Sequence, residues 1–208
     1  MNFNCLLTCA GSQETVLMSR LIATAAIAKG FDVRGYENAY SAQWWGSVVS
    51  HVRIGQKIQS PLIPQGKVDL IIALEPAEAV RVHTFLSATG RFVVLDRAVN
   101  PIAGMDAEKK YVPEEMLAYL EAFISHPSEE RAAQKGEGDW LTVIDSRALI
   151  EKCGSSTVLN TALLGVGVEK KLFPFTADDM YTALKEHILP EYLDINIRAF
   201  NVGREFAG

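Results

Sequence analysis

The chain has 208 residues, of which 49% are apolar, and a formal net charge of −5. This length and composition allow one well-buried core, and we expect a single domain over residues 1–208. The acidic balance, with lysines and arginines scattered along the chain, excludes a basic surface for phosphate backbones, so we expect no nucleic-acid partner. The most apolar stretch near the N-terminus is interrupted by Arg20 and falls short of the roughly 20 residues that cross a bilayer, so we expect no membrane span.

Three cysteines, Cys5, Cys9 and Cys153, form an odd set without the spacing of zinc or iron-sulfur ligands. We interpret them as buried thiols, which favours a reducing compartment and predicts a cytoplasmic protein.

The N-terminal residues predict a strand, a turn and a helix. Phe3 to Thr8 is a short apolar run, Ala10-Gly11-Ser12 is a turn, and Thr15 to Lys29 has a helical pattern that Gly30 ends. Phe31 to Arg34 then indicates a second strand. We therefore expect a βαβ unit and a parallel sheet.

The next segment predicts a β-hairpin inserted into that sheet. Val48 to Ile54 alternates in polarity, and Gly55-Gln56 is expected to turn it into a partner strand at Lys57 to Ser60. Val68 to Leu74 is a continuous apolar run, typical of a strand covered on both faces. Glu75-Pro76 opens a helix, and Arg91 to Asp96 predicts a further strand.

The last third of the chain becomes helical. Pro113 to Ile124 predicts an amphipathic helix, and Trp140 to Asp145 predicts a final strand. Three helical segments follow, at about Ser156 to Lys170, Ala177 to His187 and Pro190 to Phe206. The fold class is therefore α/β: a Rossmann-like three-layer domain with a mostly parallel sheet, whose body spans 1–145 and whose mainly helical tail spans 146–208.

The turn that follows the first strand is the main candidate for a binding site. Its residues are Gly11, Ser12, Gln13, Glu14 and Thr15. Backbone N–H groups in such a turn and at a helix N-terminus suit a phosphate. The turn has one glycine rather than the three of a dinucleotide fingerprint. The alternative is that Ser12 caps the helix and Glu14 stabilises its first turn.

Two further features leave alternatives open. Trp44-Trp45 is an aromatic pair suited to an interface or a ligand lid, or to a position where one indole is buried and the other lies on the surface. His51 and Arg53 share one face of their strand, which either lines a cleft or partner contact or is simply solvated.

The segment Gly46 to Gly55, Gly-Ser-Val-Val-Ser-His-Val-Arg-Ile-Gly, resembles the gamma subunits of 2-oxoacid:ferredoxin oxidoreductases, most closely the beta subunit of indolepyruvate oxidoreductase. The resemblance extends over nearly the whole chain through three further segments: Ser60 to Pro64, Asp69 to Ala79 and the tail Leu193 to Glu205.

The resemblance implies an accessory subunit without redox activity of its own. Its larger alpha-type partner would carry thiamine diphosphate, magnesium and iron-sulfur clusters, decarboxylate a 2-oxoacid oxidatively to an acyl-CoA and reduce ferredoxin. The turn Gly11 to Thr15, together with Ser47, Ser50 and Arg53, would be the place where coenzyme A is held. No catalytic residue or metal ligand is expected in this chain.

The sequence departs from the family pattern at two places. Ser12 and Glu14 stand where the family turn has glycines, and Trp44-Trp45 replaces an Arg-Gly pair. The thiamine motif Gly-Asp-Gly does not occur, and Gly138-Asp139-Trp140 is the nearest approach. The alternative functions are a free-standing module that binds coenzyme A or a nucleotide, and a small NAD-dependent dehydrogenase, which the single-glycine turn disfavours.

Overall fold

A computed structural model describes residues 2–11, 15–38, 46–99, 112–125 and 140–207. Its centre is a six-stranded sheet in the order β2-β3-β1-β4-β5-β6. The strands are β1 (Phe3–Ala10), β2 (Asp32–Glu37), β3 (Ser47–Gly55), β4 (Val68–Ala73), β5 (Leu86–Leu95) and β6 (Leu141–Ile144).

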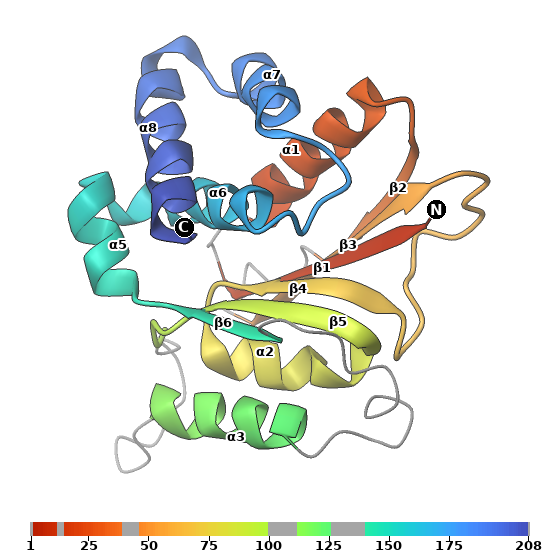
Figure 1. Ribbon diagram of the computed structural model, residues 1–208, viewed down its shortest axis with the longest axis vertical. Helices are drawn as coiled ribbons and strands as arrows, with labels where there is room; N and C mark the ends of the chain where they lie inside the picture. The colour runs from red at the N-terminus through yellow and green to blue at the C-terminus, as the bar shows by residue number, and fades with distance from the viewer. Residues whose placement is uncertain (1, 12–14, 39–45, 100–111, 126–139, 208) are drawn as a thin grey trace.

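Helices cover both faces of this sheet (Figure 1). One face carries α1 (Thr15–Ala28), α6 (Leu159–Glu169), α7 (Ala177–His187) and α8 (Pro190–Ala207), with α5 (Ser146–Cys153) beside them. The other carries α2 (Pro76–Val82) and α3 (Pro113–Ser125). Short 3-10 turns, η2 (His83–Phe85) and η3 (Ser156–Val158), precede β5 and α6. None of the described helices is long and apolar enough to cross a membrane.

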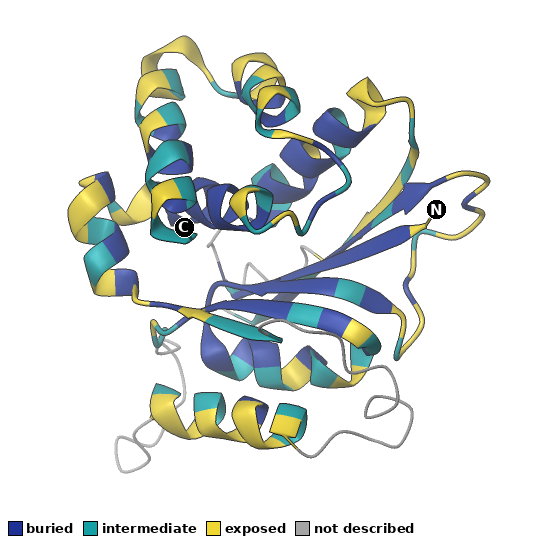
Figure 2. Ribbon diagram, viewed as in Figure 1, coloured by how far each residue is buried: buried dark blue, intermediate teal, exposed yellow. Residues whose placement is uncertain are grey.

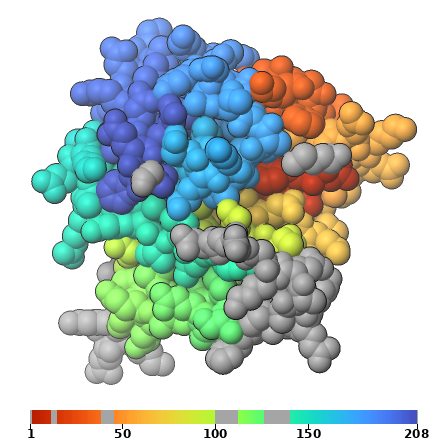
Figure 3. All heavy atoms as spheres, in the orientation of Figure 1, coloured from red at the N-terminus to blue at the C-terminus, as the bar shows by residue number. Residues whose placement is uncertain are grey.

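The burial of the elements follows their composition. β4 is apolar at nearly every position and is covered on both faces, as a central parallel strand requires. α6 is mostly apolar and is buried along most of its length (Figure 2). In the space-filling view the C-terminal helices form one continuous surface with α1, and α3 lies on the opposite side of the sheet (Figure 3).

The α/β class and the mostly parallel sheet are confirmed. β1, β4, β5 and β6 are parallel, and among the described strands only β3 is reversed, pairing antiparallel with both β1 and β2. Gly30 ends α1 as predicted: its φ is 81°, and the N–H groups of Gly30 and Phe31 donate to the carbonyls of Ile27 and Ala26.

The predicted hairpin partner is wrong. Residues 57–60 form no strand, and β3 pairs instead with β2. The cause lies at Lys57, whose left-handed φ of 58° directs the chain away from β3 while its N–H donates to the Asp32 carboxylate. As a result, β3 separates β2 from β1, and β2 becomes an edge strand.

One strand boundary and one additional helix also differ from the sequence-based expectation. β5 begins at Leu86 rather than Arg91, because Leu86 pairs with Val68 before the register shifts. The C-terminal part contains α5 in addition to the three expected helical segments, with Asp145 as its N-cap and Gly154 as its C-cap.

Candidate functional site

The carboxyl ends of β1 and β4 form the switch point of the sheet. β1 continues into α1 on one face, and β4 continues into α2 on the other (Figure 1). Neighbouring parallel strands whose helices leave in opposite directions create the crevice in which α/β proteins bind ligands. Gly11 and Thr15, the described ends of the predicted turn, lie at this switch point, which makes it the candidate site.

Gly11 sets the backbone of the turn. It is buried, its φ is 61°, and its N–H donates to the carbonyl of Gly46 over 3.0 Å. A left-handed φ favours glycine because a Cβ would crowd the following carbonyl. The turn after β1 is therefore attached directly to the start of β3.

Thr15 and Ser50 connect α1 to β3 on the same face of the sheet. Both are fully buried, and the Ser50 hydroxyl donates to Thr15 Oγ1 over 3.0 Å. These hydroxyls position the helix that follows the turn, and they do not face solvent.

Ser47 lies on the opposite face, against α2. Its hydroxyl donates to a carboxylate oxygen of Glu78, and Arg81 Nε donates to the other oxygen over 3.0 Å. Glu75 caps α2 by accepting the Glu78 N–H over 3.1 Å. Glu75 and Glu78 are 3% and 5% exposed, so two buried carboxylates already occupy this helix N-terminus. An anionic ligand at the crevice would therefore be favoured at the α1 side.

Arg53 lies far from the turn, at the other end of β3. Ser47 pairs with Ala10 at the carboxyl end of β1, whereas Arg53 pairs with Asn4 near its start. Six residues along a strand span roughly 20 Å. The Arg53 guanidinium donates to Asn4 Oδ1 (3.0 Å) and to the carbonyls of Ser60 (2.9 Å) and Leu62 (3.2 Å). It fastens the segment after β3 to the sheet.

His51 shares the face of Arg53 and is buried beneath the same segment. Its Nδ1 accepts the N–H of Ile63 over 3.2 Å, and its ring lies edge-on to Tyr36 and Phe85. Burial lowers the pKa of His51. The solvated-face interpretation of His51 is thus wrong, because residues 60–63 cover this part of the strand.

Ser12, Gln13, Glu14, Trp44 and Trp45 lie outside the described residues. The predicted contact of the turn with coenzyme A stays a prediction. Sequence reasoning missed Glu78, although the spacing of Glu75 and Glu78 at the start of a helix is a capping signal. Within the described ranges no group of three or more His, Cys, Asp or Glu side chains is placed to hold a metal ion.

A second hollow, of about 610 Å³, lies where β5 and β6 end. Its charges are mixed: Arg97 and Arg147 line it together with acidic groups. Asp96 accepts the Ser146 N–H over 2.8 Å, and Asp145 caps α5. These carboxylates already satisfy the start of α5, so the hollow presents no clear preference for an anion.

Comparison with known proteins extends over the whole fold. Residues 4–206 match the family described as pyruvate ferredoxin/flavodoxin oxidoreductase. Indolepyruvate oxidoreductase subunit IorB of Archaeoglobus fulgidus is 30% identical over 205 residues, covering 98% of this chain and 94% of the relative. The same subunit of Thermococcus kodakarensis is 24% identical over 201 residues, covering 97% and 94%.

Solved structures show the same fold. The gamma subunit of a keto/oxoacid ferredoxin oxidoreductase from Geobacter sulfurreducens has a TM-score of 0.66 at 16% identity, covering 100% of this chain and 97% of its own. The 2-oxoglutarate:ferredoxin oxidoreductase of Magnetococcus marinus, solved with 2-oxoglutarate, coenzyme A and succinyl-CoA bound, has a TM-score of 0.67 at 19% identity. This chain covers 31% of it. The resemblance first seen in Gly46–Gly55 is confirmed, and the chain belongs to the pyruvate ferredoxin/flavodoxin oxidoreductase family.

Proposed function

We propose that this chain is the accessory subunit of an indolepyruvate-type 2-oxoacid:ferredoxin oxidoreductase. The observation that carries the proposal is the family match over residues 4–206, together with relatives named as subunits whose lengths this chain nearly fills. A larger companion subunit would supply thiamine diphosphate, magnesium and iron-sulfur clusters. The assembled complex would convert a 2-oxoacid to an acyl-CoA and pass electrons to ferredoxin.

Within that complex we assign coenzyme A to the α1 side of the crevice. Two features support the assignment: the left-handed Gly11 that opens the turn, and the buried Glu75 and Glu78 that make the α2 side unfavourable for a pyrophosphate. The Ser47–Glu78 and Ser50–Thr15 contacts would hold the walls of the crevice, and Arg53 would act only on the scaffold.

The proposal extends to domain organisation and location. The whole chain acts as one gamma-type domain, in which a helical tail from residue 146 packs on the α/β body. The three free cysteines, all buried, suit the cytoplasm.

Co-expression tests the assembly. The chain is purified alone and with a thiamine-bearing companion, and reduction of a viologen dye by indolepyruvate and coenzyme A is followed. We expect no turnover by the isolated chain, and turnover by a complex in which both chains co-elute. A companion that is fully active without this chain, or an isolated chain that reduces the dye, would contradict the proposal.

A matched pair of glycine variants tests the coenzyme A assignment. Gly11→Ala and Gly154→Ala both place a Cβ at a left-handed φ, 61° and 75°, but Gly154 caps α5 away from the crevice. Each substitution should cost about 1–2 kcal/mol of stability. Only Gly11→Ala should also weaken coenzyme A binding to the complex, by about tenfold or more. Equal binding by the two variants would contradict the assignment. Tight binding of coenzyme A to the chain alone would favour the free-standing module.

A further inference from the structure

Among the described residues no strand pairs with the outer edge of β2, so this edge presents backbone groups that are unpaired there. The Asn38 N–H donates to the Val49 carbonyl over 3.0 Å, which fixes the phase of the antiparallel ladder between β2 and β3. Hydrogen-bonded pairs alternate along such a ladder. The backbone groups of Arg34 and Tyr36 therefore face β3, and those of Val33, Gly35 and Glu37 point away from the sheet.

The residues of β2 leave this edge accessible. Four of its six residues are exposed, and the strand contains no proline. Of the outward groups, the Val33 carbonyl accepts a bond from the Arg34 side chain over 2.9 Å. Proteins usually block such an edge with a short strand, a bulge or a covering segment. At the other end of the sheet the edge strand, β6, has only four residues.

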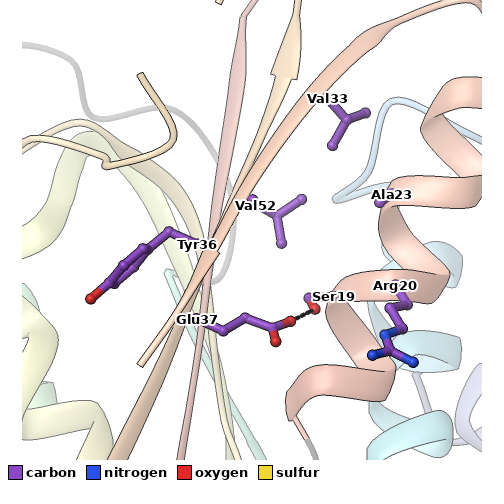
Figure 4. A pocket seen from close by; sticks show the side chains of 8 residues that line it. Ser19, Arg20, Ala23, Val33, Tyr36, Glu37 and Val52 are labelled. Carbon is purple, nitrogen blue, oxygen red and sulfur yellow. Dashed lines mark hydrogen bonds between the residues drawn. The ribbon is translucent and has the colours of Figure 1, made fainter. Parts of the chain in front are cut away.

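A groove of about 320 Å³ lies beside this edge, between β2 and α1 (Figure 4). Its lining includes the apolar side chains of Ala23, Val33 and Val52. Glu37 extends toward α1 and accepts a hydrogen bond from Ser19, which crosses the groove. The groove is large enough for one large apolar side chain.

Gly35 keeps the groove open on the strand side. Side chains alternate between the two faces of a strand, so Gly35 lies on the same face of β2 as Val33 and Glu37. The side chains of Val33 and Glu37 point toward α1 (Figure 4). A Cβ at Gly35 would meet only the His51 carbonyl, at 3.7 Å, and would otherwise project into open space. The backbone groups of Gly35 therefore point outward from the edge of the sheet, and its lack of a side chain leaves the groove open.

Charges of both signs surround the groove, because Glu37 lines it and Asp32 lies on the same strand. Arg20 lines the groove, and Arg34 stands on the exposed strand next to Gly35. Neither guanidinium forms an ion pair with any residue in the part of the chain that the structure describes. An acidic residue on the occupant would complement them.

We propose that an extended segment of the companion subunit pairs with β2 as a seventh strand. An apolar side chain of that segment enters the groove opposite Gly35, and an acidic side chain lies near Arg20 or Arg34. Addition of a strand to a free edge, with a pocket for alternate side chains, is an established mode of peptide recognition. The inference rests on the proposed function, because it takes the companion subunit as the source of the segment.

A second copy of this chain fits the edge less well. Antiparallel self-pairing through the outward backbone groups has two registers that overlap five residues of β2. In one register Gly35 lies opposite itself, so the groove faces another glycine and stays empty, which forfeits the apolar burial that it offers. In the other register Arg34 lies opposite Arg34, and like charges directly opposite each other destabilise a strand pair.

Residue-resolved hydrogen exchange tests the pairing on the isolated chain and on the complex. In the isolated chain the amides of Gly35 and Glu37 should exchange fast, and those of Arg34 and Tyr36 slowly. In the complex the Gly35 and Glu37 amides should slow by about 100-fold or more, because they become hydrogen-bonded to the added strand. This alternation is a signature that contact through side chains alone does not produce.

Two variants and a control accompany the exchange experiment. Gly35→Val should fill the groove and weaken association with the companion at least about tenfold, although valine suits a strand. Arg20→Glu, on the exposed side of α1, should weaken association in a salt-dependent way. Tyr192→Ala is the control, because this exposed aromatic side chain lies on α8, away from β2, and its loss should leave association unchanged. In Figure 4 the Tyr36 side chain points to the face of β2 opposite Val33 and Glu37.

The outcomes separate this inference from the proposed function. A complex that forms while the Gly35 and Glu37 amides exchange at the rates of the isolated chain refutes strand addition and leaves the accessory-subunit proposal intact. Failure of any companion to bind refutes both. Protection of the two amides in the isolated chain that rises with its concentration identifies a second copy as the occupant and overturns the inference.

Discussion

The crossing of α6 and α8 depends on two glycines, and replacing one of them should destabilise the fold sharply. A Cβ built at Gly203 would lie 1.9 Å from the carbonyl oxygen of Ala162, and one at Gly165 would lie 2.1 Å from that of Phe200. The obstructing atoms belong to backbone, which has no rotamer to change. The helices can accept a methyl group here only by moving apart.

The size of the effect of Gly203→Ala follows from this distance. Ordinary contact begins near 3.4 Å, so the helices must separate by about 1.5 Å at the crossing. A gap of that size removes much of the packing around Phe200, and overpacking of a tight core costs about 3 kcal/mol. Alanine regains about 1 kcal/mol of helix propensity relative to glycine. We therefore expect a net loss of about 2 kcal/mol, or roughly 4–8 °C in Tm.

Urea and thermal unfolding of the purified chain measure this loss. Asp194→Ala is the control, because Asp194 is exposed on α8 and its replacement changes helix propensity without touching the crossing. The control should stay within about 0.5 kcal/mol of the parent chain. If Gly203→Ala were as stable as the parent chain, the close approach of α6 and α8 would be refuted.

Two further predictions concern β3. Burial lowers the pKa of His51, so the unfolded chain takes up a proton at a higher pH than the folded chain. The contribution that a neutral, buried His51 makes to the unfolding free energy is therefore complete above the usual pKa of 6.5. It declines as the pH falls below that value. His51→Gln keeps an acceptor for the Ile63 N–H and should flatten the decline of the unfolding free energy between about pH 7 and 5, measured by urea titration. An unchanged dependence of the unfolding free energy on pH would show that His51 does not cause the decline. Ser47→Ala removes a donor from the buried Glu78 carboxylate and should cost about 1–3 kcal/mol of unfolding free energy. Ser47→Thr should retain most of that stability, and equal losses in the two variants would show that the hydroxyl is not responsible.

Local structure was largely predictable from the sequence. The first strand, the small-residue helix closed by Gly30, and the apolar run of β4 all lie where periodicity and capping residues indicate. These features depend on neighbours within a few residues. The same local rules identified Glu75-Pro76 as the start of a helix, which the structure confirms.

Such local rules do not predict which strands pair with each other. Alternation in residues 48–54 predicts a strand but does not say which other strand it pairs with. The short segment 57–60 is adjacent in sequence, whereas β1 and β2 offer ladders of eight and six pairs. The longer ladders determine the pairing, and β2 consequently lies at the edge of the sheet.

The candidate site shows the same limit in a different form. Ser47, Ser50 and Arg53 stand within seven residues of one another, which suggests one binding surface. A strand instead places Ser50 on the α1 face, and Ser47 and Arg53 on the other face at opposite ends. Proximity in sequence within a strand therefore did not mean proximity at the site.

The contacts of these three residues explain how Gly46–Gly55 can match the family while the turn after β1 departs from it. Ser50 holds the start of α1, Ser47 holds the start of α2, and Arg53 holds residues 60–62, so each fastens a different element to β3. The segment thus maintains the crevice whatever the crevice binds. We expect the affinity for an anion to depend instead on the residues of the turn, where the resemblance implies that Ser12 and Glu14 stand in place of glycines. Likeness in β3 is therefore evidence for shared architecture, and binding of coenzyme A has to be tested at the turn itself.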